Sequence, residues 1–368
     1  MKVLVTGANG FIGKNLVLRL REQADTEVLT FARGDSDAAL QAALTLADAV
    51  IHLAGENRPT FPDAFEQVNA GLTRQICDGL RALGKSVPLL LASSAQAELD
   101  NPYGRSKLAA EQAVEQLAQA NGNPVAVYRL PGVFGKWCRP NYNSVVATFC
   151  HNKAHDLPVQ INDANARIRL VYVDDVISAF LSLLATPWSG AMRPVVQPEY
   201  SITLGELSAQ IDAFKNCRNT LVSERVGTGL TRALYATYVS YLPKDKFAYE
   251  VPAYGDARGV FVEMLKTPDA GQFSFFTAHP GITRGGHYHH TKTEKFLVIK
   301  GKARFGFRQM LTNEVYHLDT EGAKPQVVET VPGWTHDITN IGDEEMVVML
   351  WANEIFDRAN PDTITSKV

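Results

Sequence analysis

The sequence predicts two domains: an α/β domain built on a doubly wound parallel sheet, followed by an all-β barrel. First, a chain of 368 residues is longer than one ordinary core requires. Second, strand-length apolar stretches alternate early in the chain with amphipathic helical stretches, as at 3–5, 14–21 and 28–31. Third, from about residue 252 this alternation gives way to short strands separated by Gly, Pro and Asn turns.

The boundary between the two domains is predicted near Asp245. A tyrosine-rich segment over 235–249 lies between the two kinds of pattern, and the barrel strands predicted beyond it include 273–277, 294–299 and 346–351. The predicted domains are residues 1–245 and residues 246–368.

Composition and charge exclude several classes of protein. With 45% hydrophobic and 20% charged residues the chain folds rather than remaining disordered. A net charge of -3 with mixed signs gives no long-range attraction to nucleic acid or to an anionic membrane. The four cysteines form no Cys-x-x-Cys pair, no apolar stretch approaches membrane-spanning length, and Met1-Lys2 leads straight into a strand rather than a signal peptide. We therefore expect a cytoplasmic protein with no nucleic-acid partner and no membrane insertion.

A glycine-rich turn joins the first predicted strand to the first predicted helix. Gly7, Gly10 and Gly13 follow the strand at 3–5 with a Gly-x-x-Gly-x-x-Gly spacing. Such a turn needs glycines because it is tight, because a phosphate must approach bare backbone N–H groups, and because the helix packs close to the strand. The turn therefore predicts nucleotide binding.

The residue after the second predicted strand favours one nicotinamide cofactor over the other. NAD enzymes commonly place a carboxylate there for the ribose 2′-hydroxyl, whereas this chain has Arg33. A guanidinium can pair with a 2′-phosphate, so Arg33 predicts NADP(H).

Three side chains with the chemistry of carbonyl reduction follow in order. Ser93-Ser94 ends an apolar strand, and Tyr103 and Lys107 lie four residues apart at the start of a helical pattern that runs to about Gln119. On a helix the tyrosine and the lysine share one face, where the ammonium can lower the pKa of the phenol. The phenol can then donate a proton to a developing alkoxide while a nearby serine orients the carbonyl.

Together these residues resemble the extended short-chain dehydrogenase/reductase family, a Rossmann-type fold whose members act on nucleotide sugars. The resemblance covers about residues 1 to 245. It implies that Tyr103 is the acid, Lys107 its partner and Ser94 the orienting hydroxyl. Ala95 follows where many relatives have another hydroxyl, which leaves Ser93 as the alternative to Ser94. The implied cofactor-binding residues are Gly7, Gly10, Phe11, Ile12, Gly13, Arg33, Ala54 and Gly55.

Several basic residues lie in segments that cover the substrate in such enzymes. They are either a clamp for a diphosphate or ordinary surface charges, and Arg167 and Arg169 are the better clamp candidates. The full set is Arg58, Lys136, Arg139, Arg167 and Arg169.

The second domain contains four residues of metal-ligand type. His287 and His289 are two apart on a predicted strand, so both point to one face, and Glu294 and His336 can reach that face from neighbouring strands. Three imidazoles and a carboxylate suit a divalent first-row metal such as Zn, Fe, Ni or Mn, with Zn as the prediction.

This pattern, bracketed by Gly281 and Gly301 and followed by 332–340, resembles the cupin (jelly-roll) superfamily. One departure is Pro332, which directly precedes Gly333 where one residue usually separates them. The segment at 256–263 also resembles the opening strand of cupin-fold epimerases that act on 4-keto deoxysugars. A metal beside such a sugar would stabilise the enolate formed when a base removes the C3 proton. The sequence leaves that base open among His290, Lys295, Tyr288 and a metal-bound water.

Over its whole length the chain resembles the bifunctional capsular or O-antigen polysaccharide enzymes of the UDP-N-acetyl-L-fucosamine pathway. The resemblance implies that the cupin domain epimerises C3 of UDP-2-acetamido-2,6-dideoxy-4-hexulose. It also implies that the N-terminal domain then reduces the C4 ketone with NADPH to UDP-2-acetamido-2,6-dideoxy-L-talose. The implied substrate is a UDP-4-keto-6-deoxy-N-acetylhexosamine, and because both families pair readily we expect a homodimer.

Two other interpretations stay open. In one, the chain is only a reductase and the cupin is a binding or dimerisation module. In the other, the N-terminal half is a 4-epimerase or dehydratase with tightly held NAD. Arg33 argues against the second interpretation because enzymes that exchange cofactor each cycle commonly take NADP.

Overall fold

The computed structural model describes residues 1–59, 63–256, 259–262, 265, 267, 271–354 and 359–368. It contains two compact units, and the chain passes between them more than once. The first unit comprises Met1–Arg139 and Ile168–Ser201, and the second comprises Pro140–Arg167 and Ile202–Val368. Part of the segment predicted to belong to the first domain thus groups with the C-terminal strands, and the boundary near Asp245 stays a prediction.

A six-stranded sheet forms the centre of the first unit, as predicted. All of its neighbouring strands run parallel, in the order β2-β1-β3-β4-β5-β8. The apolar runs at 3–5, 49–52 and 89–92 are buried on both sides, which is why they lack a polar alternation, whereas the run at 28–31 is only partly buried. The strands are β1 (Lys2–Thr6), β2 (Glu27–Phe31), β3 (Ala49–His52), β4 (Leu89–Ser94), β5 (Val125–Leu130) and β8 (Ala191–Met192).

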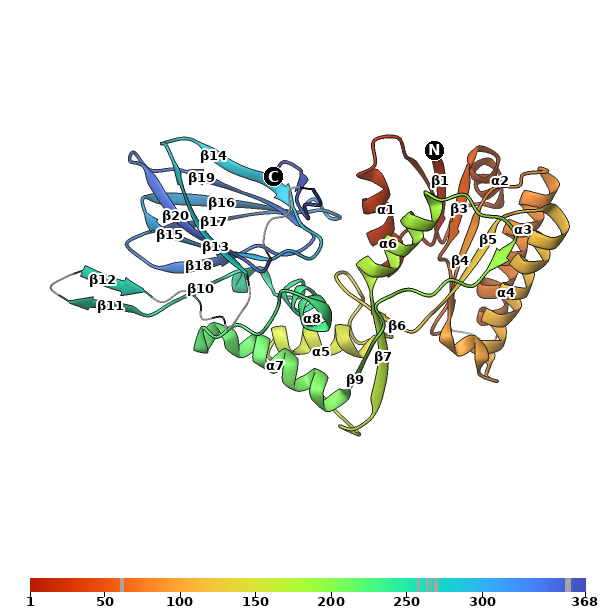
Figure 1. Cartoon of the computed structure of the whole chain (residues 1–368), viewed down its shortest axis with the longest axis horizontal. Coiled ribbons are helices and arrows are strands. Elements are labelled where there is room, and N and C mark those ends of the chain that lie inside the picture. Colours follow the sequence, from red (N-terminus) through yellow and green to blue (C-terminus); the bar gives the residue numbers. More distant parts are fainter. Residues whose placement is uncertain (60–62, 257–258, 263–264, 266, 268–270, 355–358) are drawn as a thin grey trace. The chain divides into compact units, whose positions relative to one another are not determined.

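Helices cover both faces of this sheet. Figure 1 shows α1 (Phe11–Arg21) and α6 (Val173–Leu184) on one side and α2, α3 and α4 on the other. Leu44, Ile76 and Val114, one from each of the latter three helices, join the strands in a single hydrophobic core. The doubly wound α/β fold is therefore confirmed. The three helices are α2 (Asp37–Leu46), α3 (Leu72–Ala82) and α4 (Pro102–Asn121).

Shorter elements complete the first unit. A π-helical turn η1 (Glu66–Gly71) leads into α3, and a 3₁₀ turn η2 (Ala95–Glu98) follows β4. A small sheet has the order β6-β7-β9, with β6 (Gly132–Phe134) and β7 (Arg167–Tyr172) parallel. The division between the units falls at the first residue of β7 and within β9 (Tyr200–Thr203).

The second unit combines helices with two antiparallel five-stranded sheets (Figure 1). The helices α5 (Val145–Ala154), α7 (Leu204–Thr220) and α8 (Gly229–Val239) pack against one another, and a 3₁₀ turn η3 covers Lys244–Lys246. One sheet has the order β10-β18-β15-β20-β13 and the other β17-β16-β19-β14-β21. Antiparallel all-β architecture at the C-terminal end is therefore confirmed.

Successive strands of the second unit often change sheet, so apolar side chains from both sheets meet between them. The first sheet contains β10 (Ala248–Glu250), β18 (Gln326–Glu329), β15 (Glu294–Lys300), β20 (Met346–Ala352) and β13 (Gln272–Ala278). The second contains β17 (Val315–Glu321), β16 (Lys302–Gln309), β19 (Trp334–Asn340), β14 (Thr283–Tyr288) and β21 (Ile364–Thr365).

A hairpin of β11 (Ala253–Asp256) and β12 (Gly259–Val262) falls in the segment predicted to open the barrel, although 257, 258 and 263 lie outside the described residues. Among the helices that the structure describes, none has the length and apolar character needed to cross a membrane.

Candidate functional site

The glycine turn has the backbone geometry that the sequence predicted. Gly7 has φ +69°, and a Cβ there would lie 2.7 Å from the backbone nitrogen of Ala54. A Cβ on Gly13 would lie 2.2 Å from the carbonyl oxygen of Gly7. Gly10 is the N-cap of α1 and provides no side-chain cap, so the first N–H groups of the helix, beginning at Phe11 and Ile12, have no capping side chain. This turn fits a pyrophosphate.

Arg33 lies directly after β2, with its side chain 83% exposed. Its guanidinium is 2.9 Å from Oε2 of Glu56, which follows Ala54 and Gly55 in the loop after β3. The arginine is therefore available to a ligand at this edge of the sheet, and Glu56 competes for it. Sequence reasoning missed Glu56 because 23 residues separate the pair in the chain.

The structure brings Tyr103 and Ser94 together. Tyr103 lies in the first turn of α4, and the Ser94 side chain lies beside its phenol. Burial raises the pKa of Tyr103, and the Ser94 hydroxyl opposes that shift. Ser93 points elsewhere, because its hydroxyl donates to Oε1 of Glu111 at 2.5 Å. Ser94 is therefore the serine that faces the phenol.

Lys107 lies one turn after Tyr103 and is almost completely buried. Its ammonium donates to the carbonyl oxygen of Ala92 at 3.1 Å, and a Cβ on Gly55 would approach Nζ to 3.2 Å. Burial lowers the pKa of Lys107 to about 8, against the opposing influence of the Glu111 carboxylate. The ammonium thus lies between the end of β4 and the loop that follows β3.

Two buried polar residues that sequence reasoning missed fix this arrangement. Glu111, with no exposed surface, accepts from Ser93 and from the guanidinium of Arg129 through both carboxylate oxygens. Asn69 donates to the Ser106 hydroxyl at 2.9 Å and accepts from the backbone N–H of Glu56 at 2.8 Å. The signal for Glu111 was its place four residues after Lys107, on the same face of the helix.

The predicted diphosphate clamp divides into separate ion pairs. Lys136 is buried and lies 3.0 Å from Oδ1 of Asp174. Arg169 is largely exposed and makes a bidentate pair with Glu199. Arg167 is exposed at the start of β7, and Arg58 and Arg139 have partners of their own. A phosphate role for any of these residues stays a prediction.

In the second unit, His287, His289, Glu294 and His336 converge. One nitrogen or carboxylate oxygen from each lies within 4.8 Å of the others. His287 in β14 pairs with His336 in β19. The register of the two strands shifts at a β-bulge between Gly285 and His287. Glu294 is the first residue of β15, and His289 follows the end of β14.

The burial and charge of these four residues fit a divalent metal. Oε2 of Glu294 lies 3.1 Å from Nε2 of His289 and 3.4 Å from Nε2 of His336. Burial lowers the pKa of His287 to about 3, so its imidazole is neutral. Burial opposes ionisation of Glu294, but the neighbouring imidazoles of His289 and His336 hold its pKa well below the usual range. Both ring nitrogens of His336 are buried without a hydrogen-bond partner among the described residues.

The structure narrows the candidates for a base beside this cluster. Lys295 follows Glu294 in β15, so its side chain points to the opposite face, where its ammonium pairs with Glu329. Burial opposes its charge, but Glu329 raises the pKa of Lys295 well above the ordinary value. Of the four candidates left open, Lys295 therefore faces away from the histidine cluster. Lys292, missed from the sequence, has its ammonium 2.8 Å from Oε1 of Glu294.

Tyr288 and His290 alternate with the two histidine ligands along the chain. Their rings lie 5.5 Å apart, centroid to centroid. Both stay candidates for the base.

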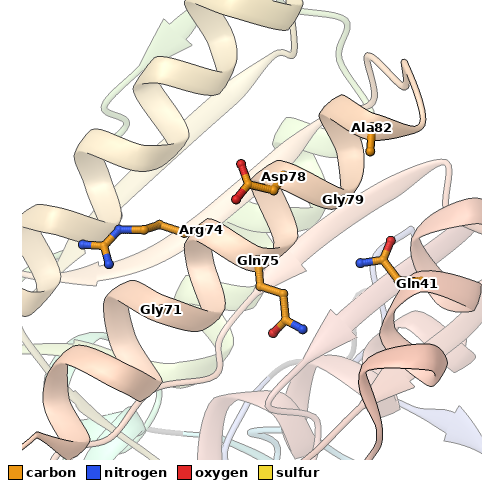
Figure 2. Close-up of a pocket in the computed structure, with 7 residues that line it drawn as sticks. All are labelled: Gln41, Gly71, Arg74, Gln75, Asp78, Gly79 and Ala82. Atoms are coloured by element: carbon orange, nitrogen blue, oxygen red, sulfur yellow. The ribbon is translucent and has the colours of Figure 1, made fainter.

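Figure 2 shows an open hollow between α2 and α3. None of the predicted site residues lines it. Its lining residues are Gln41, Gly71, Arg74, Gln75, Asp78, Gly79 and Ala82.

Two family models match the chain, one over the α/β fold and the other over the C-terminal antiparallel strands. Residues 3–196 match the NAD dependent epimerase/dehydratase family. Residues 254–364 match the polysaccharide biosynthesis C-terminal domain.

Individual proteins resemble the whole chain. It is 57% identical over 368 residues to a UDP-2-acetamido-2,6-beta-L-arabino-hexul-4-ose reductase of Pseudomonas aeruginosa, covering 100% of this chain and 99% of the relative. The capsular polysaccharide assembling protein CapF of Staphylococcus aureus has 41% identity and a TM-score of 0.68, with all of both chains covered. A UDP-glucuronic acid 4-epimerase of Bacillus cereus, 18% identical with a TM-score of 0.53, shares the fold over 59% of this chain and 83% of its own.

Proposed function

The chain belongs to the NAD dependent epimerase/dehydratase family, and from that premise we propose that it reduces the 4-keto group of a UDP-linked 2-acetamido-2,6-dideoxy sugar with NADPH. The observation that carries this proposal is the Tyr103 phenol, which lies beside the Ser94 side chain and one helical turn from the buried ammonium of Lys107. The substrate class is supported by the reductase from Pseudomonas aeruginosa, whose identity to this chain extends over its full length.

Each residue of the reduction site has a separate task. When bound, a nicotinamide supplies the hydride that reaches C4 of the sugar. Tyr103 donates its proton to the oxygen that becomes the C4 hydroxyl, and Ser94 orients that oxygen. Lys107 stabilises the phenolate that Tyr103 leaves behind. Arg33 supports NADP(H), because a guanidinium can bind the 2′-phosphate.

Reduction is tested with a UDP-4-keto-6-deoxy-N-acetylhexosamine and NADPH. We expect stoichiometric oxidation of NADPH and a product whose C4 carries hydrogen and hydroxyl by NMR. A 4-epimerase or dehydratase with tightly held NAD would convert the sugar without net consumption of NADPH, and that result would refute the reductase.

We also propose that the second unit holds a divalent metal, with Zn as the first choice, and epimerises C3 of the same keto-sugar. His287, His289, Glu294 and His336 would hold the ion. When bound, the metal supplies positive charge that polarises the 4-keto oxygen. A base then removes the C3 proton and a proton returns from the other face. Lys292, His290, Tyr288 and a metal-bound water are the candidates for these transfers.

Epimerisation is tested by C3 exchange. The full chain without NADPH is mixed with the keto-sugar in deuterated water, and NMR follows loss of the C3 proton. We expect exchange in the unmodified protein and in Tyr103→Phe, and none in Glu294→Ala. Equal exchange in Glu294→Ala would indicate instead that the C-terminal strands serve as a binding or dimerisation module. The expected homodimer is a separate proposal, to be measured by sedimentation.

A further inference from the structure

The last residues of the chain lie against the strands that carry the metal ligands. In β21, Thr365 pairs with His287 and Ile364 pairs with Tyr288 of β14. Ser366 continues this contact, because its N–H donates to the carbonyl oxygen of Gly286 at 2.9 Å. The segment 362–366 therefore adds a strand beside β14.

The same segment contacts the strand of a second ligand. The hydroxyl of Thr335 donates to the carbonyl oxygen of Ser366 at 2.8 Å. Thr335 immediately precedes His336 in β19. Two of the four ligand residues are thus fixed next to this C-terminal segment.

Asp362 organises the loop between the other two ligands. One carboxylate oxygen accepts the N–H of His290 at 2.9 Å. The other accepts the N–H groups of Thr291 and Lys292, at 2.7 and 2.8 Å, and the Thr291 hydroxyl at 3.0 Å. Because this loop joins His289 to Glu294, the carboxylate holds three consecutive N–H groups of the turn between two ligand residues.

The backbone of Asp362 acts on one ligand directly. Its carbonyl oxygen is hydrogen-bonded to Nδ1 of His289. A carbonyl can only accept, so Nδ1 carries a proton and donates, which leaves Nε2 as the nitrogen that would bind the ion. Nε2 is also the atom that faces Glu294, at 3.1 Å.

We propose that Asp362 is a positioning residue of the metal centre. It fixes the tautomer of His289 through its carbonyl oxygen and the loop from His289 to Glu294 through its carboxylate. This inference rests on the proposed metal site and adds a residue 72 positions from His290 to it. Loss of an outer partner of this kind typically weakens metal binding about 10- to 100-fold.

The test measures binding of the metal itself to the full-length protein after its metal has been removed. Asp362→Ala removes the carboxylate and leaves the backbone carbonyl. Asp362→Asn keeps one oxygen, which can still accept from Thr291 and Lys292. Asp319→Ala is the matched control, because the Asp319 side chain is exposed and pairs with Arg304 on a neighbouring strand of the same unit. Zn²⁺ affinity is obtained by competition with a chromophoric chelator, and bound Co²⁺ reports the coordination through its visible spectrum.

We expect Asp362→Ala to bind Zn²⁺ at least about 10-fold more weakly, Asp362→Asn to lose less, and Asp319→Ala to match the unmodified protein. The Co²⁺ spectrum of Asp362→Ala should differ from that of the unmodified protein. Zn²⁺ affinity within twofold of the unmodified value in Asp362→Ala overturns the inference while leaving the metal proposal intact. If Asp362→Ala does not fold, equal affinity in Asp362→Asn overturns it. An unmodified protein that binds neither ion contradicts both proposals.

Discussion

We expect the ionisation of Lys107 to limit the rate of the proposed reduction at alkaline pH. Burial lowers its pKa to about 8, so its protonated form is lost as the pH rises through that value. The titratable groups around it are Tyr103, Glu111 and His52, and burial lowers the pKa of His52 to about 3, which keeps that ring neutral. We expect kcat for ketoreduction to be level near neutral pH and to fall above about pH 8.

The control for this pH dependence is Lys107→Arg. A guanidinium keeps its charge throughout the range from pH 6 to 10, so the alkaline fall should disappear even if the maximal rate is lower. Profiles of kcat for both proteins measure this. An alkaline fall at the same pH in Lys107→Arg would assign the ionisation to another group.

We expect substitutions of the two adjacent serines at the end of β4 to have different effects on kcat and on stability. Ser94→Ala removes the hydroxyl beside the Tyr103 phenol and should lower kcat about 10-fold or more. It also removes the acceptor for the Gln96 N–H that caps η2, which should cost about 1 kcal/mol of stability. Ser93→Ala leaves the Glu111 carboxylate without one donor, which should cost about 1.5 to 3 kcal/mol of stability and leave kcat nearly unchanged. Steady-state kinetics and thermal unfolding of both variants measure this. A larger loss of kcat in Ser93→Ala would reverse the assignment.

For single residues, the sequence predicted the residue types at the site better than the direction in which each side chain points. Both serines end one apolar strand, and only the sheet register decides which faces the phenol. The direction of Lys295 was likewise not predictable, because its neighbour Glu294 takes the face toward the histidines. Spacing along a helix is more informative, and Tyr103 and Lys107 were predicted correctly as a pair on one helix.

At the scale of elements, α4 carries Tyr103 and Lys107 of the proposed reduction site on one helix. Asn101 caps its first turn by accepting from the N–H of Gly104, and Pro102 occupies the start. A Cβ on Gly104 would lie 2.3 Å from the carbonyl oxygens of Gln96 and Leu99, so the helix start packs directly on η2. Tyr103 is fixed within this capped turn.

Glu111 is expected to be a main contributor to the stability of this element. Glu111→Ala removes a fully buried carboxylate from the partly exposed guanidinium groups of Arg129 and Arg193, and loss of a charged hydrogen-bond partner typically costs about 1.5 to 3 kcal/mol. Glu115→Ala, one turn later, removes a partly exposed partner of Arg193 and should cost less than about 1 kcal/mol. Thermal unfolding compares the two. Equal shifts in Tm would show that the buried network adds nothing beyond surface pairing.

Elements with strong local signals were predictable. The helix after the glycine turn was expected over 14–21 and begins at Phe11, and α4 was expected to about Gln119 and ends at Asn121. The π-helical turn at Glu66–Gly71 was not predicted, because no local residue pattern distinguishes it from the start of α3. Yet its Asn69 ties α4 to the loop that carries Gly55 and Glu56.

For the whole molecule, the contacts that could not be predicted from the sequence are those between residues far apart along the chain. The order of an α/β fold and an antiparallel β fold could be predicted, because each has its own hydrophobic period. The grouping of 140–167 and 202–245 with the second unit could not, since contacts far apart in sequence decide it. Asp362 illustrates the same limit, because nothing near it in the sequence points to His289 or His290.

The two proposed activities lie in different units, so metal removal should separate them. Ser94, Tyr103 and Lys107 belong to the first unit, whereas the four converging metal-ligand residues belong to the second. After removal of metal by a chelator and its separation from the protein, we expect C3 exchange of the keto-sugar to be lost. A keto-sugar whose C3 is already inverted should still be reduced at an unchanged rate with NADPH, because no step at Tyr103 needs the ion.

Deuterium exchange by NMR and NADPH absorbance measure the two activities on one sample. Added Zn²⁺ should restore exchange, and Glu294→Ala should behave like the metal-free protein with or without added ion, because it lacks the only carboxylate among the four ligands. If reduction of the inverted keto-sugar is lost together with exchange and returns with Zn²⁺, the ion serves both units and the separation is wrong. Exchange that persists at full rate without metal would instead place the chemistry at C3 on a side chain alone, and Lys292, 2.8 Å from Glu294, would then be the first residue to substitute.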